Sequence, residues 1–203
     1  TALETGIQRH LIERNTSGSY HFSHQNVYQL FLRGIDLVHQ RVFHERIALA
    51  LDAPTSTLDD DQIYQLAHHY YHAKSDDPYF NQRGYDLLIK SARLAVANYA
   101  FQEAYDYLKH AQEIAQREAI TINAEDEALF ADVCLQRGSI SEALAHLERA
   151  SMNTEDTYER ARLQVKQVIL QSSSSKREDI LAAFCSICRD LGVPFPTSGS
   201  GLL

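Results

Sequence analysis

The sequence predicts an all-α protein, built as a right-handed solenoid of helical hairpins, on three observations. The 203 residues include 8 glycines and 4 prolines, too few for a turn-rich β-sandwich. Apolar residues recur at helical spacing along most of the chain. One alanine-centred pattern occurs twice, which indicates a repeated helical unit. A chain of this length buries about 70% of its unfolded surface, enough for a core without cross-links.

The first predicted element is a short helix, because apolar residues recur at helical spacing from Leu3 to Ile12. The turn-forming residues 15–18 end this helix. The alternating aromatic triplet at 20–22 predicts one strand or wing, and Ser23 is a good N-cap for a following helix. The chain up to this point is therefore expected to be the remnant of a winged helix.

Two helices are expected between Val27 and Leu51, because an apolar face runs through this stretch and Gly34 interrupts it. The acidic run 59–61 suits the first turn of the next helix, which ends near Lys74. A further helix is expected to start at the next Asp-Pro pair, since proline is well placed in a first helical turn.

The pattern then becomes repetitive. Residues 99–104 lead into an apolar helix, and residues 138–143 do the same. The central alanines Ala104 and Ala143 lie 39 positions apart (143 − 104), and a weaker third copy at Ile180 follows after 37 (180 − 143). A tetratricopeptide unit has about 34 residues, so irregular hairpins are expected. The alanine lets the second helix of a hairpin lie close against the first.

Three segments follow from this pattern. Residues 1–52 are expected to hold the winged-helix remnant and connecting helices, and residues 53–192 the tetratricopeptide-like repeats. Residues 193–203 are expected to form a linker or tail, because Pro194 and Pro196 precede a Gly/Ser run.

Charge and composition exclude several classes of function. The 19 basic and 27 acidic residues give a net charge of −8, which argues against a nucleic-acid-binding surface. No apolar run approaches the about 18 residues needed to cross a membrane, and no secretory signal is evident. Three cysteines predict no disulfide framework and favour a cytoplasmic location. Phosphate-binding glycine loops and nucleophile-elbow motifs are missing, so no catalytic or cofactor-binding residue is predicted.

Two constellations have metal-ligand spacing. His68 and His72 are four positions apart and would share a helix face, as two zinc ligands can. No third ligand accompanies them in the sequence, so packed or surface histidines are favoured and no metal residue is predicted. Cys185 and Cys188 lack a second pair, which favours small buried hydrophobic residues. A small helical metal-binding protein or enzyme using the two histidines is the alternative hypothesis.

The 11 tyrosines are either helix-packing wedges or the lining of a groove that recognises a peptide. On the second interpretation, candidate partner-binding residues are Tyr64, His68, Tyr71, Tyr99 and Tyr105.

Four short stretches share motifs with one family of signalling proteins. Tyr20–Val27 matches an aromatic-x-Phe-x-His-x-x-Val/Ile segment that ends a winged-helix-like part, and Val42–Ala48 matches the Leu-His-x-x-Ile-Ala/Gly helix after it. Ile63–Ala73 matches a Leu-Ala-x-His-Tyr-x-x-Ala helix, and Cys188–Pro196 matches a closing Leu-Gly-Val/Ile-x-x-Pro stretch. Together these stretches resemble the helical segment of STAND-type signalling ATPases. The usual Ala-Ala-Tyr after the first helix is replaced by Tyr28–Phe31.

The resemblance implies a segment of a large regulator with a kinase, nucleotidyl cyclase or DNA-binding output domain. It implies that His69 is a helix-packing residue and that ATP is bound in an upstream domain, not in this segment. The expected function is therefore noncatalytic: regulation and protein interaction, by binding a partner protein or the parent's own ATPase module through the helical array. A passive spacer is the structural alternative.

Overall fold

The computed structural model describes residues 2–16, 18, 20–52, 58–172 and 175–194. Within these ranges the chain forms ten helices and two short strands, so the protein is all-α, as predicted. Nine of these helices follow Phe22, the number expected from the sequence. Most of the expected tail, from 195 to 203, lies outside the described residues.

The elements are, in chain order, α1 (Ala2–Gln8), β1 (Ile12–Arg14), β2 (Tyr20–Phe22), α2 (Gln25–Gly34), α3 (Leu37–Leu51), α4 (Asp60–Ala73), α5 (Pro78–Ala97), α6 (Phe101–Glu118), α7 (Ala124–Gln136), α8 (Ile140–Asn153), α9 (Thr157–Gln171) and α10 (Arg177–Asp190).

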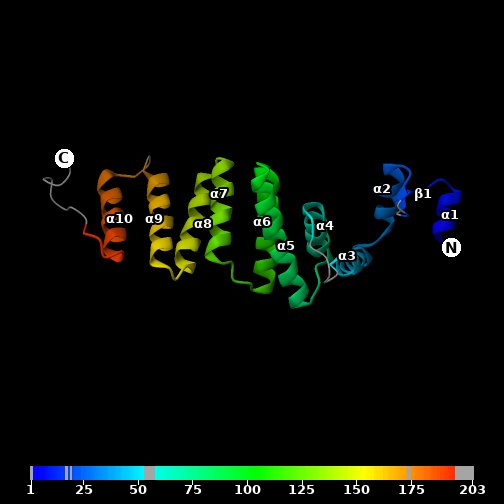
Figure 1. Cartoon of the computed structure of the whole chain (residues 1–203), viewed down its shortest axis with the longest axis horizontal. Helices are drawn as coiled ribbons and strands as arrows, with labels where there is room; N and C mark the ends of the chain where they lie inside the picture. Colours follow the sequence, from blue (N-terminus) through cyan, green and yellow to red (C-terminus); the bar gives the residue numbers. More distant parts are fainter. Residues whose placement is uncertain (1, 17, 19, 53–57, 173–174, 195–203) are drawn as a thin grey trace.

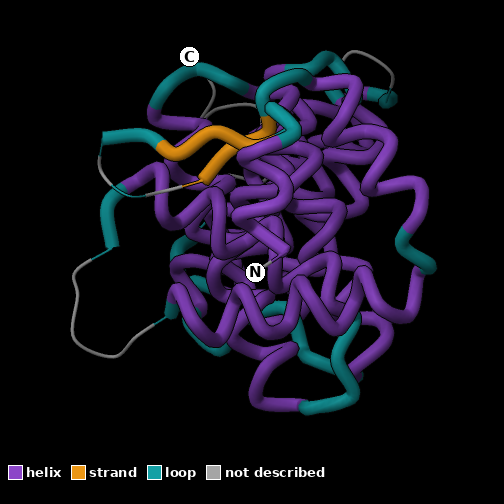
Figure 2. Tube along the Cα trace, turned by 90° about the vertical axis from the view of Figure 1, so that its right-hand side faces the viewer, coloured by secondary structure: helices purple, strands orange, loops and turns teal. Residues whose placement is uncertain are grey.

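The helices follow one another along the longest axis of the molecule in their sequence order, with α1 at one end and α10 at the other (Figure 1). From α3 to α10, each helix packs on its neighbours in the chain. Figure 2, which looks along this axis from the N-terminal end, shows the two short strands beside the helices. Most tertiary contacts therefore join segments that are close in sequence.

The first element ends earlier than predicted. Helix α1 stops at Gln8, and His10 adopts a left-handed φ of 54°. Residues 12–14 do not continue the helix: they form β1, which pairs antiparallel with the predicted strand at 20–22. The Ile12 side chain folds back onto α1, where a Cβ on Gly6 would lie 2.8 Å from its Cδ1. Pairing with β2 satisfies the backbone groups that a helical continuation would otherwise use.

The start of α2 also differs from the prediction. His24 is the N-cap residue and makes no side-chain capping bond, whereas Ser23 was expected there. The Ser23 hydroxyl is buried and has no hydrogen-bond partner among the described residues. The break at Gly34 is confirmed, and Asp36 caps α3 by accepting from the backbone N–H groups of Val38 and His39.

The acidic and proline start signals are confirmed. Asp59 and Gln62 form a reciprocal capping box at the start of α4, which ends before Lys74. Asp77 caps α5, where Pro78 occupies the first turn.

The 39-residue repeat is confirmed in the backbone. Tyr99 and Gly138 occupy equivalent turns before α6 and α8, with left-handed φ values of 59° and 77°. The N-cap residues that follow them, Ala100 and Ser139, share a φ of −87° and have ψ values of 66° and 69°. A hydrogen bond of 2.9 Å from each N-cap N–H to a carbonyl five positions earlier closes both turns.

The repeated alanines are fully buried within the helical hairpins. Ala104 packs within the α5–α6 hairpin and Ala143 within α7–α8, and both are 0% exposed. Ile180, at the centre of the weaker third copy, is only partly buried. The largest buried cluster joins α3 through α8, and two smaller clusters continue it to α10. Helix α2, in contrast, has no buried residue.

Candidate functional site

The histidines of α4 meet another histidine from α3. The His44 ring centroid lies 5.5 Å from that of His68 and 5.2 Å from that of His72, and the latter two are 4.4 Å apart. His44 Nδ1 and His69 Nδ1 lie 2.9 Å apart. We call these four residues the histidine cluster. The sequence offered no neighbour for His68 and His72, whereas the structure brings the His44 ring to them from a different helix.

The aromatic contacts continue from the histidine cluster onto α6. Tyr71 stacks on His110 with ring centroids 3.9 Å apart, and its hydroxyl donates to Glu113 at 2.6 Å. Tyr64 stacks on Tyr107 of the same helix at 5.6 Å. Of the predicted partner-binding residues, Tyr64, His68 and Tyr71 therefore lie on one stretch of α4.

The histidine cluster is held in the neutral form. Loss of water around each ring lowers the pKa of His44, His68, His69 and His72, and repulsion from neighbouring imidazoles adds to the effect. The pKa of His72 falls to about 4. Neutral imidazoles are metal ligands, but in the described part of the chain these four do not bring three ligand atoms within 4.8 Å of one another.

A groove of about 530 Å³ lies between α2, α3 and α4, and the histidine cluster forms one of its walls. The rest of its lining is mainly apolar and consists of Tyr28, Leu32, Ile35, Gln40, Phe43 and Ile47. An apolar floor with a few neutral polar rings is suited to apolar side chains of a ligand.

Outside this groove, α2 and α3 carry further large apolar side chains that are exposed. Leu30 is 74% exposed, Leu37 70% and Val38 68%. We define the α2–α3 apolar surface by the exposed residues Leu30, Phe31, Leu37, Val38, Phe43 and Leu49. Exposed apolar patches of this kind mark interaction sites in soluble proteins.

The other two predicted partner-binding residues lie elsewhere. Tyr99 is in the α5–α6 turn, 83% exposed, with an edge contact to Phe101. Tyr105 is half-buried: its hydroxyl donates to Glu142 at 3.1 Å, and the Arg137 guanidinium lies 3.6 Å from the centre of its ring. The five predicted residues therefore do not form one contact face.

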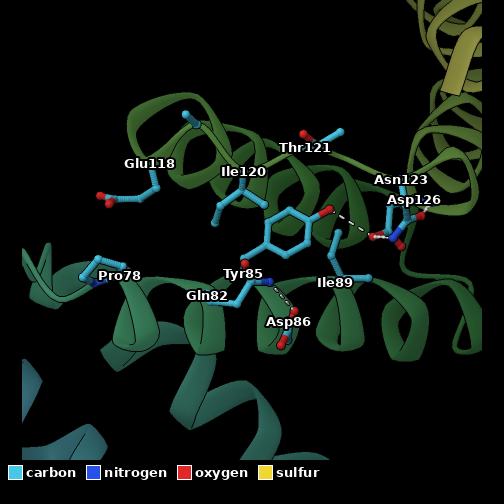
Figure 3. Close-up of a pocket in the computed structure, with 11 residues that line it drawn as sticks. Pro78, Gln82, Tyr85, Asp86, Ile89, Glu118, Ile120, Thr121, Asn123 and Asp126 are labelled. Atoms are coloured by element: carbon cyan, nitrogen blue, oxygen red, sulfur yellow. Dashed lines mark hydrogen bonds between the residues drawn. The ribbon is translucent and has the colours of Figure 1, made fainter.

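A second hollow, of about 620 Å³, lies between α5 and the segment joining α6 to α7 (Figure 3). The Tyr85 ring stands in it, and its hydroxyl donates to Asp126 at 2.9 Å. Arg93 pairs with the same carboxylate at 2.9 Å. Burial and the nearby carboxylate raise the pKa of Tyr85. Because these polar groups already bind one another, we interpret the hollow as part of the structural contact between α5 and α7.

Two acidic residues in the first turn of α7 are buried. Asn123 provides the cap, while Asp126 and Glu127 are 5% and 3% exposed. Glu127 lies 2.6 Å from His146 Nδ1 and 3.0 Å from Arg149 Nε. His146 Nδ1 also lies 2.7 Å from Arg149 Nη2, a donor from which Nδ1 could accept only without its own proton. Because a carboxylate only accepts and its contact is the shorter of the two, we assign the Nδ1 proton of His146 to the Glu127 bond. Glu127 thus ties α7 to α8 through a buried hydrogen bond to His146 and an ion pair with the partly exposed Arg149.

Next to this pair, Cys134, Glu142 and His146 bring one ligand atom each within 4.8 Å of one another. Cys134 and His146 are buried, and Glu142 pairs with Lys109 at 2.8 Å. Burial, followed by the Glu142 carboxylate, raises the pKa of Cys134 to about 12. Sequence reasoning missed this cluster, although Glu142 and His146 have the four-residue spacing that drew attention to His68 and His72.

The remaining cysteines are less buried than predicted. Cys185 and Cys188 on α10 are both free and partly exposed, so they are not core residues.

None of the helices in the described ranges has the length and apolar character that a membrane crossing requires. Comparisons with protein-family models, curated proteins and solved structures find no match to this chain. The fold defines an all-α protein, and its function must be argued from its surfaces.

Proposed function

We propose that this chain is a noncatalytic regulatory and protein-interaction segment that binds a partner protein through the groove and the α2–α3 apolar surface. One observation carries the proposal: α2 and α3 expose most of their large apolar side chains, whereas α4 to α8 bury or half-bury theirs except Tyr79, Ile140 and Met152. Covering such a surface stabilises a complex by about 25 cal/mol for each Å² removed from water. A partner with an apolar segment is therefore the occupant that the surface favours.

The proposal includes a finer description of the fold, namely a right-handed tetratricopeptide-like solenoid preceded by a winged-helix remnant. The 39-residue backbone repeat and the packing of each helix on its chain neighbours support the first part. The order of α1, a two-stranded hairpin and α2 supports the second.

The motif resemblance supports a further proposal about the partner. In STAND-type regulators the helical array follows an ATPase module, so the module of the parent protein is the partner that the resemblance favours. ATP would be bound there and not by this segment. Contact with the groove would then couple the state of the module to the helical array.

The test places a photo-crosslinking amino acid at Phe43, which lines the groove and is 45% exposed. The matched control carries it at Tyr79 on α5, which is 88% exposed and lies outside the groove. We expect a protein adduct from position 43 and none from position 79. The adduct is identified by mass spectrometry, and the purified partner is then titrated against each variant.

In that titration, Phe43→Ser is expected to weaken binding by about tenfold or more, since a central apolar anchor contributes over about 1.4 kcal/mol. Tyr79→Ser is expected to bind as the unmodified chain does. Equal adducts at both positions, no adduct at 43, or equal loss of affinity in both variants would each contradict the proposal.

A further inference from the structure

Three side chains of different chemistry converge at the α7–α8 hairpin. Glu142 and His146 lie one turn apart on α8, and Cys134 lies near the end of α7. Their ligand atoms are within 4.8 Å of one another, and no other set of three metal-ligating side chains among the described residues meets this condition. The arrangement joins the two helices of one hairpin.

A second observation indicates that the imidazole is oriented. The Glu127 carboxylate, 3% exposed, holds His146 Nδ1 at 2.6 Å, and Phe130 stacks on the ring at a centroid distance of 3.8 Å. With Nδ1 donating to the carboxylate, Nε2 keeps its lone pair for a ligand. Buried carboxylates that orient metal-binding histidines in this way are common in zinc sites.

We propose that Cys134, Glu142 and His146 bind a divalent cation of zinc type, with water as the fourth ligand. Thiolate, imidazole and carboxylate are the three ligand types that Zn²⁺ uses, and a thiolate disfavours the harder cations Mg²⁺ and Ca²⁺. The site goes beyond the proposed protein interaction and is independent of it, because the groove lies between α2, α3 and α4.

Binding requires two changes at the site. The Cys134 thiol releases its proton to solvent as sulfur forms a bond to the cation, so one H⁺ leaves for each cation bound. The Lys109 ammonium, 2.8 Å from Glu142, must leave the carboxylate. The Lys109 and Glu142 side chains are 38% and 29% exposed, so the lysine can turn into water and the cation can enter along the carboxylate. The affinity for the cation is therefore expected to increase by about tenfold for each unit that the pH is raised near neutrality.

The test titrates Co²⁺ into the full chain as a spectroscopic probe for Zn²⁺. We expect one equivalent to give a thiolate-to-cobalt charge-transfer band in the near ultraviolet, together with intense visible bands of four-coordinate cobalt. Adding Zn²⁺ should displace Co²⁺ and so remove both the charge-transfer band and the visible bands. Cys134→Ser is expected to lose the charge-transfer band, while the double variant Cys185→Ser/Cys188→Ser keeps it.

Two further variants probe the surroundings of the site. Glu127→Gln should keep the band but bind about 10–100-fold more weakly, because the imidazole loses its orienting carboxylate. Lys109→Met should bind more tightly than the unmodified chain, because it removes the competing ammonium. Glu142→Gln, which changes a partly exposed ligand, should weaken binding without unfolding and so serves if Cys134→Ser does not fold by circular dichroism.

Several results would overturn the proposal. One is the lack of a charge-transfer band in the unmodified chain at saturating Co²⁺. Another is a band that depends on Cys185 and Cys188 and not on Cys134. Visible cobalt bands without a thiolate band, lost in the variant His68→Gln/His72→Gln, would assign the cation to the histidine cluster instead.

Discussion

The two repeat turns allow a matched pair of substitutions. Tyr99 and Gly138 occupy the same position, both in the left-handed region with φ values of 59° and 77°, and the next residues have nearly identical φ and ψ. One turn therefore uses a bulky residue where the other uses glycine. Tyr99→Gly is expected to stabilise the protein, and Gly138→Ala to destabilise it.

The size of the expected change in the free energy of unfolding follows from the backbone conformation alone. A left-handed conformation costs an L-residue with a side chain about 1–2 kcal/mol, whereas glycine loses about 0.5–1 kcal/mol more backbone entropy on folding. The difference is about 0.5–1 kcal/mol in favour of glycine. Side-chain contacts change it little, because Tyr99 is 83% exposed and a Cβ at Gly138 would have no atom within 4 Å.

The assay is urea denaturation followed by circular dichroism, with thermal melting as a second measurement. In a chain of this length the expected free energies correspond to melting-temperature shifts of about 1–4 °C, upward for Tyr99→Gly and downward for Gly138→Ala. Gly34→Ala is the control, because Gly34 ends α2 without a left-handed φ and has open space around it. The stability of the Gly34→Ala variant should equal or exceed that of the unmodified chain. Destabilisation by Tyr99→Gly, or stabilisation by Gly138→Ala, would refute the reasoning.

Three further predictions concern packing, a buried hydrogen bond and pH. Ala104→Leu should lower the free energy of unfolding by about 1–3 kcal/mol, because Ala104 is 0% exposed and a larger side chain would overpack its site. The control Ala97→Leu, at an exposed position, should change the free energy of unfolding by under about 0.5 kcal/mol in the same urea experiment. Glu127→Ala should cost about 1–3 kcal/mol by leaving the buried Nδ1–H of His146 without its partner, and an unchanged urea midpoint would contradict this. Stability should fall as the pH drops below about 6.5, because the pKa values of the histidine cluster in the folded chain lie below the unfolded value of 6.5, so the unfolded chain takes up protons first. The contribution of His72 is present above pH 6.5 and is lost as the pH falls toward about 4, so urea midpoints in His72→Gln should depend less steeply on pH.

The features that the sequence predicted well depend on interactions within a few residues. The acidic start of α4, the proline in the first turn of α5 and the break at Gly34 each involve groups from one helix end. The equivalence of Ala104 and Ala143 could also be predicted, because close helix approach requires a small side chain at one position of every hairpin. These signals were enough to define an all-α chain and most of its helix boundaries.

The candidate sites depended on partners that the sequence does not place. Residues 12–14 have apolar spacing that fits a helix, and only pairing with β2 makes them a strand. His68 and His72 looked isolated until α3 brought His44 to them.

Glu127 lies in the first turn of α7, and its partner His146 lies on the next helix, 19 positions away. Helix propensity and capping depend on residues that are close together in the sequence, so the sequence determined the helices. The tertiary structure decided which titratable groups are desolvated and which of them meet, because burial and convergence are properties of the assembled helices.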